Sequence, residues 1–156
     1  MRRRLLAVFA AVALTFGLGM AVAHQARAAT TGPITGYQGL CLDVRSASTA
    51  DGTPVQVYTC NGTGAQQWTV ESNGTIQALG KCLDVSGAGT ANGTKVQLYT
   101  CNGTGAQSWQ AQSNGELVNP NSGKCLDDTG FGGAGTQLQI WSCSGGTNQA
   151  WTLPTA

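Results

Sequence analysis

The chain has 156 residues, a formal net charge of +1 and a charged fraction of only 10%, well below the usual quarter. Beyond residue 28, four basic residues stand against seven acidic ones, a formal charge of −3 without a basic patch. This composition argues against nucleic acid as a partner and predicts a polar, mostly uncharged surface.

The first 28 residues predict a secretory signal peptide. A positive start at Arg2 to Arg4 precedes an apolar run from Leu5 to Ala23, and Ala26-Arg27-Ala28 supplies the small residues of a cleavage site. A retained membrane anchor is the alternative, because the run approaches the roughly 20 residues that a span requires. We expect removal of residues 1–28, no membrane association afterwards, and a secreted, extracellular protein made of residues 29–156.

A unit of about 42 residues then occurs three times without a linker. Its early cysteines are 41 and 43 residues apart, and the tryptophans of its closing Gln-x-Trp motif are 41 and 42 apart. A repeat of this kind buries its apolar face by stacking on its neighbours, so we expect a single domain. The repeats span residues 36–70, 76–110 and 117–151.

The six cysteines predict disulfides, since the chain is expected to be secreted. Six cysteines allow fifteen pairings, and pairing within each repeat is the assignment that keeps the three copies equivalent. A zinc site lacks CxxC spacing and a histidine beyond residue 28. We expect no metal and no cofactor, and we predict the bonds Cys41–Cys60, Cys82–Cys101 and Cys125–Cys143.

Short runs within each repeat alternate between apolar and polar residues, which is typical of half-buried strands. Asn-Gly pairs punctuate these runs and indicate tight turns. The Asn-Gly-Thr triplets also fit the glycosylation sequon, but a threonine after a turn glycine commonly opens a strand. The chain is therefore expected to be all-β, with turns at Asn61, Asn73, Asn92 and Asn102.

Strand alternation also predicts a binding surface in each repeat. Asp84 lies two residues after Cys82, and Tyr99 lies two residues before Cys101, so a bond between these cysteines brings a carboxylate near an aromatic ring. Gln97 shares the face of Tyr99. The equivalent residues are Asp43, Gln56 and Tyr58 in the first repeat, and Asp127, Gln139 and Trp141 in the third.

These three residue types suit a sugar. A carboxylate accepts hydrogen bonds from neighbouring hydroxyls, a carboxamide both donates and accepts, and a ring covers the C–H face of a pyranose. The alternative is structural: each aspartate caps a turn and each ring covers a disulfide. Repetition at three matching positions favours binding.

The CLDV, VQLYTC and Gln-x-Trp motifs resemble the ricin B-type lectin family, which includes carbohydrate-binding modules attached to secreted glycosidases. The resemblance covers about residues 36–153. It implies a β-trefoil, with three four-stranded repeats around a pseudo-threefold axis and a sugar pocket in each repeat. It also implies that Trp68, Trp109 and Trp151 are core residues.

The resemblance assigns sugar contacts to the aspartates, carboxamides and rings named above. The family places a sugar-binding asparagine before the Gln-x-Trp glutamine, and here the third repeat alone has it, as Asn148. The first and second repeats have Ala65 and Ala106 at this position. Asn61 and Asn102 lie in the same loops and are candidate substitutes. Asp128, next to Asp127, is expected to be solvated. The remaining implied contacts are Gln66, Gln107 and Gln149.

We therefore expect a non-catalytic lectin-like module that binds galactose-type or xylose-type glycans, with polysaccharides and secreted glycosidases as partners. Catalysis is disfavoured because residues 29–156 contain no histidine, and Glu71 and Glu116 have no paired carboxylate in the pattern. The alternative is a disulfide-linked trefoil scaffold that acts as a protein-interaction or inhibitor module with decayed sugar sites.

Overall fold

The structure is a computed structural model that describes residues 29–155. The predicted signal peptide lies outside the described residues. Over the described range, the helical structure consists of six 3-10 turns of three residues each, and no helix there is long and apolar enough to cross a membrane. The described chain is otherwise built from strands and turns, as the alternating pattern predicted.

The strands are β1 (Thr30–Gly32), β2 (Cys41–Val44), β3 (Thr53–Tyr58), β4 (Trp68–Val70), β5 (Ile76–Ala78), β6 (Lys81–Val85), β7 (Val96–Tyr99), β8 (Gln110–Ala111), β9 (Leu117–Asn119), β10 (Lys124–Asp127) and β11 (Gln139–Trp141). The 3-10 turns are η1 (Tyr37–Gly39), η2 (Arg45–Ala47), η3 (Gly64–Gln66), η4 (Ser86–Ala88), η5 (Gly105–Gln107) and η6 (Thr147–Gln149).

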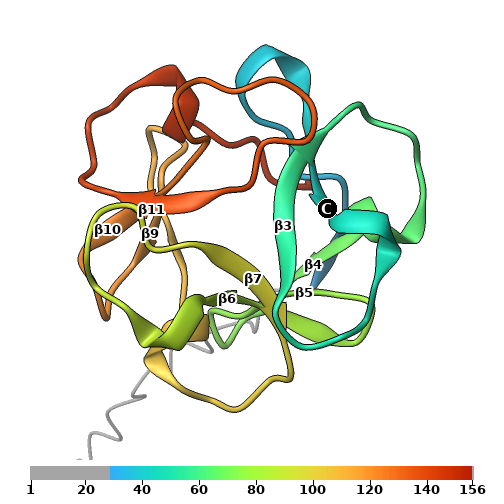
Figure 1. Ribbon diagram of the computed structural model, residues 1–156, viewed down its shortest axis with the longest axis horizontal. Helices are drawn as coiled ribbons and strands as arrows, with labels where there is room; N and C mark the ends of the chain where they lie inside the picture. Colours follow the sequence, from blue (N-terminus) through green and yellow to red (C-terminus); the bar gives the residue numbers. More distant parts are fainter. Residues whose placement is uncertain (1–28, 156) are drawn as a thin grey trace, which may run out of the picture.

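Three antiparallel hairpins, β2/β3, β6/β7 and β10/β11, form the same part of each repeat. Their second strands, β3, β7 and β11, lie around the centre of the molecule, and the loops project outward around them (Figure 1). Strand β3 pairs with β7, and bridges join Gln56 to Gln137 and Lys95 to Gln139. The repeats therefore close on one another as the expected β-trefoil.

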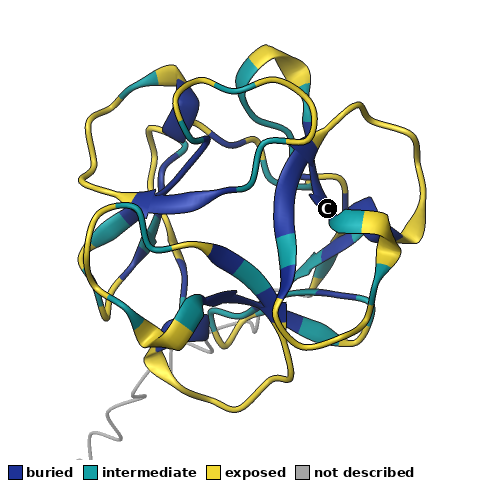
Figure 2. Cartoon of the chain, in the orientation of Figure 1, coloured by how far each residue is buried: buried dark blue, intermediate teal, exposed yellow. Residues whose placement is uncertain are grey.

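The two ends of the described chain also meet, through a bridge between Thr35 and Thr152. Buried residues follow the central strands, and exposed residues follow the outer loops (Figure 2). Trp68, Trp109 and Trp151 are buried, as predicted, and each indole N–H donates to a backbone carbonyl of the strand that carries the pocket aspartate. These tryptophans fix each closing motif to the core, because a buried indole N–H requires an acceptor.

The disulfides join Cys41 to Cys60, Cys82 to Cys101 and Cys125 to Cys143, which confirms the predicted pairing. The Asn-Gly pairs form turns as expected. Gly62 and Gly103 have φ of +70° and +69°, a conformation that glycine adopts without steric cost. The preceding Asn61 accepts from the backbone N–H of Thr63, so its side chain completes the turn.

Candidate functional site

The register of each hairpin places an aspartate directly opposite a glutamine. Asp84 on β6 is the partner of Gln97 on β7, and the Gln97 Nε2 donates to Asp84 Oδ1 at 2.9 Å. The same contact measures 2.9 Å in the other two repeats. Sheet pairing alone thus brings together the carboxylate and carboxamide that the alternation predicted to share a face.

In each repeat, the glutamine of the Gln-x-Trp motif donates a hydrogen bond to Oδ2 of the aspartate. Gln107 donates from Nε2 to Asp84 Oδ2 at 2.9 Å and to the Thr100 carbonyl, and its Oε1 accepts from the Asn102 N–H. Gln66 and Gln149 make the equivalent bonds to Asp43 and Asp127.

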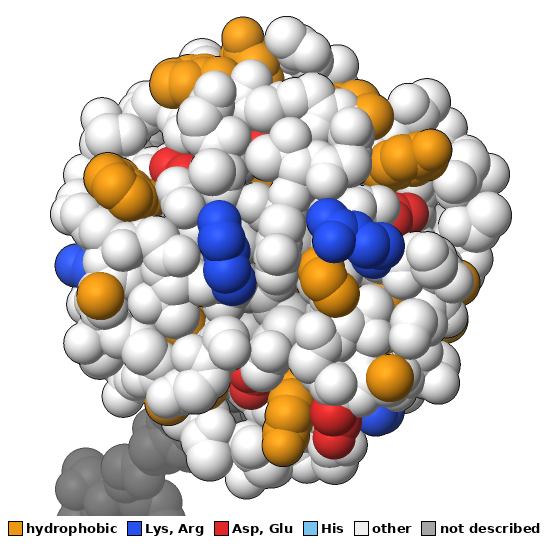
Figure 3. Space-filling model, in the orientation of Figure 1, with side chains coloured by type: hydrophobic (Ala, Val, Ile, Leu, Met, Phe, Trp, Pro, Cys, Tyr) orange, Lys and Arg blue, Asp and Glu red, His pale blue; other side chains and the backbone are white. Residues whose placement is uncertain are grey.

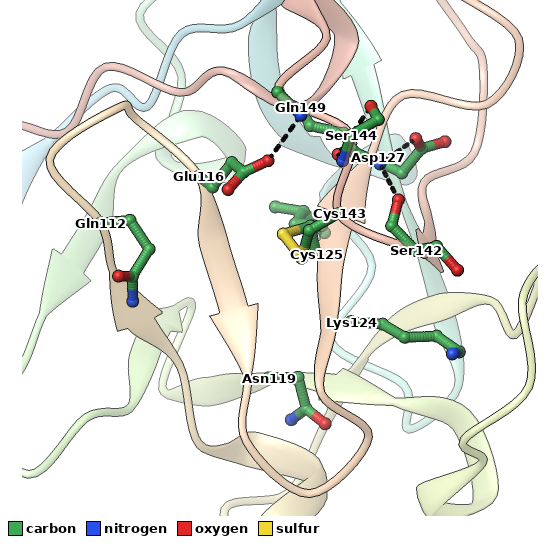
Figure 4. Close-up of a disulfide and its surroundings, with 12 residues drawn as sticks. Gln112, Glu116, Asn119, Lys124, Cys125, Asp127, Ser142, Cys143, Ser144 and Gln149 are labelled. Atoms are coloured by element: carbon green, nitrogen blue, oxygen red, sulfur yellow. Dashed lines mark hydrogen bonds between the residues drawn. A yellow bond between two sulfur atoms is a disulfide. The ribbon is translucent and has the colours of Figure 1, made fainter.

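These three glutamines are 1% exposed and their polar hydrogens are already used. They therefore position the aspartate and tie the disulfide-bearing loop to it, whereas the family resemblance implied direct sugar contact. Figure 4 shows the third copy, in which Asp127 and Gln149 lie together beside the Cys125–Cys143 disulfide.

Each aspartate keeps acceptor capacity for a ligand. Asp43 and Asp84 receive one amide hydrogen on each oxygen, and Asp127 receives one on Oδ1 and two on Oδ2, while a carboxylate offers about four lone-pair sites. Burial raises the pKa of Asp84, and the bonds from Gln97 and Gln107 oppose that shift. The carboxylates thus form the floor of each site and keep lone pairs that no protein donor occupies within the described chain.

The predicted rings stand at the rim. Tyr58, Tyr99 and Trp141 are 42%, 37% and 44% exposed and each lines a hollow with its own aspartate and glutamine. The first, second and third pockets measure about 560, 290 and 590 Å³, within or close to the range of small-ligand sites. A ring that remains this exposed beside a buried carboxylate matches the polar floor and apolar wall that a sugar requires.

The rims differ between repeats. Asn148 lines the third pocket and donates from Nδ2 to Asp127 Oδ2 at 2.9 Å and to the Asp128 carbonyl at 3.2 Å. Ala65 and Ala106 line the first and second pockets at the equivalent place. Asn61 and Asn102 also line those pockets, where their Oδ1 atoms accept from a threonine of the same turn.

Arg45 distinguishes the first pocket. It lies on the pocket wall, donates from Nε to Gln56 Oε1 at 2.8 Å and from Nη2 to the Gly135 carbonyl at 3.2 Å. The repeat pattern gives no signal for Arg45, because Ser86 and Thr129 stand at the equivalent positions of the other repeats. On the face shown in Figure 3, lysine and arginine side chains stand in small separate groups among uncharged atoms.

The expectation that Asp128 is solvated is wrong. The residue is fully buried, and within the described chain neither carboxylate oxygen has a hydrogen-bond partner. Burial raises its pKa to about 6, with the nearby Gly132 backbone N–H opposing the shift and the Asp127 charge adding to it. Val44 and Val85 occupy this position in the other repeats, and comparing the repeats would have predicted burial.

Glu116 lies close to the third disulfide, with an oxygen within 4.8 Å of Cys125 and Cys143 sulfurs. Both cysteines are oxidised in that bond, so they supply no thiolate for a metal. Glu116 Oε1 instead accepts from the Gly145 N–H at 2.9 Å, and Oε2 accepts from Asn114. This bond anchors the loop that carries Ser144, which lines the third pocket.

Comparison with known proteins identifies the family to which the chain belongs. Residues 30–151 match the model of the ricin-type beta-trefoil lectin domain. The chain is 48% identical over 122 residues to serine protease 1 of Rarobacter faecitabidus, covering 78% of this chain and 23% of that protein. It is 63% identical over 103 residues to a glucan endo-1,3-beta-glucosidase of Cellulosimicrobium cellulans, covering 65% of this chain and 19% of that protein.

The chain therefore spans about a quarter or less of the length of these two relatives. Among solved structures, a non-toxic homologue of type II RIPs from Momordica charantia, in complex with α-methyl-D-galactoside, superposes with a TM-score of 0.73. That match has 33% identity and covers 81% of this chain and 48% of the other.

Proposed function

The chain belongs to the ricin-type β-trefoil lectin family, and from this premise we propose that it is a secreted, non-catalytic module that binds polysaccharides or glycans through up to three pockets. One observation carries the proposal. In each repeat a buried aspartate, held by at least two amide donors, lines the same pocket as an aromatic ring that the fold leaves exposed.

A purely structural role does not account for these rings. Exposing an aromatic face forgoes about 25 cal/mol for each Å² left in water, and the three rings recur at the same place above a carboxylate. The aspartate and glutamine supply directional hydrogen bonds to hydroxyls, and the ring covers the less polar face of the sugar. In the proposal the direct contacts are the aspartates, Gln56, Gln97, Gln139, the rings and Asn148.

We assign galactose-type or xylose-type residues as the ligands. The galactoside bound to the Momordica charantia relative, which is 33% identical to this chain over the aligned part, supports the first class. Because the hollows are open, much of a bound sugar stays hydrated. We expect a dissociation constant near 1 mM for each pocket, which corresponds to about −4 kcal/mol.

Several weak pockets on one molecule suit a polymer. When one pocket is engaged, the next sugar of the same polysaccharide is present at a high effective concentration, so overall affinity rises without new contacts. The similarity to part of a glucan endo-1,3-beta-glucosidase supports partnership with a secreted glycosidase. Three disulfides are consistent with extracellular use.

Retention of the oxidised protein on insoluble matrices tests the proposal. We expect retention on galactose-bearing agarose or on xylan, release by the matching free sugar, and weaker retention on an unrelated glucan. The control is the triple variant Tyr58→Ala, Tyr99→Ala and Trp141→Ala, which removes three exposed rings and leaves the core intact. Equal retention of wild type and control, or no retention on any matrix, would favour the interaction-module alternative.

A further inference from the structure

The third pocket carries a second aromatic side chain that the other pockets lack. Phe131 lines the same hollow as Trp141, and the two rings are 51% and 44% exposed. Phe131 is the fourth residue after Asp127, and the fourth residues after Asp43 and Asp84 are Ala47 and Ala88. Those alanines line the first and second pockets.

The three positions have nearly the same backbone φ, so they differ mainly in their side chains. Ala47 and Ala88 both have φ of 51°, and Phe131 has φ of 56°. This left-handed conformation is costly for a bulky side chain, and the exposed ring gains little from burial. Neither the local backbone nor the core therefore favours phenylalanine over the alanine found in the other two copies.

Phe131 is nevertheless held in place. Its ring meets the ring of Tyr37, from the 3-10 turn η1, edge to face with centroids 5.4 Å apart and planes at 78°. Aromatic pairs at this distance attract each other beyond their simple area of contact. The ring is thus supported on one side by Tyr37 and remains open to the pocket.

We propose that Phe131 and Trp141 form a two-ring subsite, so that the third pocket binds two consecutive sugar residues of a chain whereas the second pocket binds one. This inference rests on the proposed function and names the ligand of that site more closely. One sugar lies at Asp127 against Trp141, and the C–H face of its neighbour packs on Phe131. The size of the hollows agrees: the third measures about 590 Å³ and the second about 290 Å³.

The first pocket is also large, at about 560 Å³, but Arg45 lies on its wall and no second ring lines it. It offers hydrogen bonds where the third pocket offers an apolar face. The volume alone therefore does not define the subsite. The pair of exposed rings does, and it occurs in one repeat of the described chain.

Trp141 makes the third pocket separately observable. The chain has four tryptophans, and Trp68, Trp109 and Trp151 are buried, at 0%, 4% and 4% exposure. A change in tryptophan fluorescence on adding sugar therefore reports the third pocket. The double variant Tyr99→Trp with Trp141→Tyr moves this reporter to the second pocket and retains a ring at both sites.

The test is a fluorescence titration of the oxidised protein with two matched pairs: galactose with galactobiose, and xylose with xylobiose. We expect the longer sugar of the bound class to bind the third pocket about fivefold more tightly than its monosaccharide, equivalent to about 1 kcal/mol. Phe131→Ala should remove this gain and leave the monosaccharide affinity within twofold. Alanine is already accepted at this backbone conformation at Ala47 and Ala88, so the variant is expected to fold.

With the reporter moved to the second pocket, the longer sugar should show no such gain. If monosaccharide binds but the longer sugar gains nothing, or if Phe131→Ala keeps the gain, the two-ring subsite is overturned and the proposed lectin function stands. If no sugar of either pair changes the signal of Trp141 and no matrix retains the protein, both proposals fail.

Discussion

The second and third pockets have the same floor and different rims. Asp84 with Gln97 and Gln107 matches Asp127 with Gln139 and Gln149, and the corresponding amide-to-carboxylate distances lie between 2.8 and 2.9 Å. At the rim, Ala88, Tyr99 and Ala106 are replaced by Phe131, Trp141 and Asn148. The sheet register and the Gln-x-Trp motif therefore fix the floor, and the loops are free to diversify what each pocket recognises.

The two repeats also differ beneath the pocket. The second repeat places Val85 in the core after its aspartate, and the third places Asp128 there. Asp128 is fully buried, and its carboxylate has no hydrogen-bond partner among residues 29–155. A buried carboxyl group of this kind costs stability when it ionises. The third repeat thus combines a rim with two aromatic rings and a buried carboxyl group in its interior.

The largest expected effect tests the shared floor. Replacing Gln107 or Gln149 with methionine, which keeps the side-chain length, should lower the free energy of unfolding by about 3 kcal/mol, because several buried polar groups lose their partner. Urea denaturation measures this loss. A loss below about 1 kcal/mol in both variants would contradict the positioning role.

The same pair of variants distinguishes the pockets. Asp84 Oδ2 loses its single amide donor in Gln107→Met, whereas Asp127 Oδ2 keeps the donor from Asn148 in Gln149→Met. Sugar binding should therefore persist in the third pocket of Gln149→Met and be lost from the second pocket of Gln107→Met. If the Asn148 hydrogen bond to Asp127 contributed nothing, a site-resolved NMR titration would show equal losses of sugar affinity in the two pockets.

A second prediction concerns the buried Asp128. Its pKa is raised to about 6 from a value near 4 in the unfolded chain, so the native state retains a proton that the unfolded state has released between these pH values. Stability should fall as pH rises through this window and level off above it. The expected loss is about 1 to 3 kcal/mol, measured by urea denaturation at pH 4, 5, 6 and 7.

Asp128→Val restores the residue of the other repeats and should remove this pH dependence, raising stability most at pH 7. Asp51→Ala is the matched control. The hydrogen bond from Lys81 lowers the pKa of the exposed Asp51 carboxyl, so the contribution of Asp51 to stability is lost as pH falls, opposite in direction to that of Asp128. If the slope between pH 4 and 6 survives in Asp128→Val, another group is responsible.

A third prediction separates binding from stability at the rims. Trp141→Ala should weaken monosaccharide binding in the third pocket by about tenfold, roughly 1.4 kcal/mol, and Tyr99→Ala should weaken the second pocket by a similar or smaller factor. Neither should change the midpoint of thermal unfolding by more than about 3 °C, because both rings are exposed. A large fall in that midpoint would assign the rings to the scaffold.

The smallest expected effect comes from Asn148→Ala, which gives the third pocket the alanine that lines the second. It removes one donor to Asp127 and one to the Asp128 carbonyl, and we expect about threefold weaker binding with a stability loss near 1 kcal/mol. Isothermal titration together with urea denaturation measures both. Binding that is unchanged would show that alanine suffices at this rim position, as the first two pockets suggest.

The repeat pattern predicted the fold closely because each repeat carries the same strand alternation, cysteines and Gln-x-Trp motif. The pairing of Asp84 with Gln97, and the disulfides, follow from local register and from threefold equivalence. The burial of Gln66, Gln107 and Gln149 did not follow, because it depends on how the closing 3-10 turn folds beneath the carboxylate. The burial of Asp128 could have been predicted, because the equivalent residues Val44 and Val85 are core valines. Arg45 and Phe131 have no equivalent in the other repeats, so a pattern based on recurrence gave no signal for them.

The most direct measurement is an NMR titration of the uniformly ¹⁵N-labelled, oxidised protein with methyl α-D-galactoside and, separately, with xylose. The aspartate-floored pockets predict saturable shifts with one of these sugars at backbone amides next to Tyr58, Tyr99 and Trp141, with millimolar dissociation constants and the largest changes in the third pocket. Shifts absent from all three pockets at saturating sugar, or confined to residues outside them, would contradict the account.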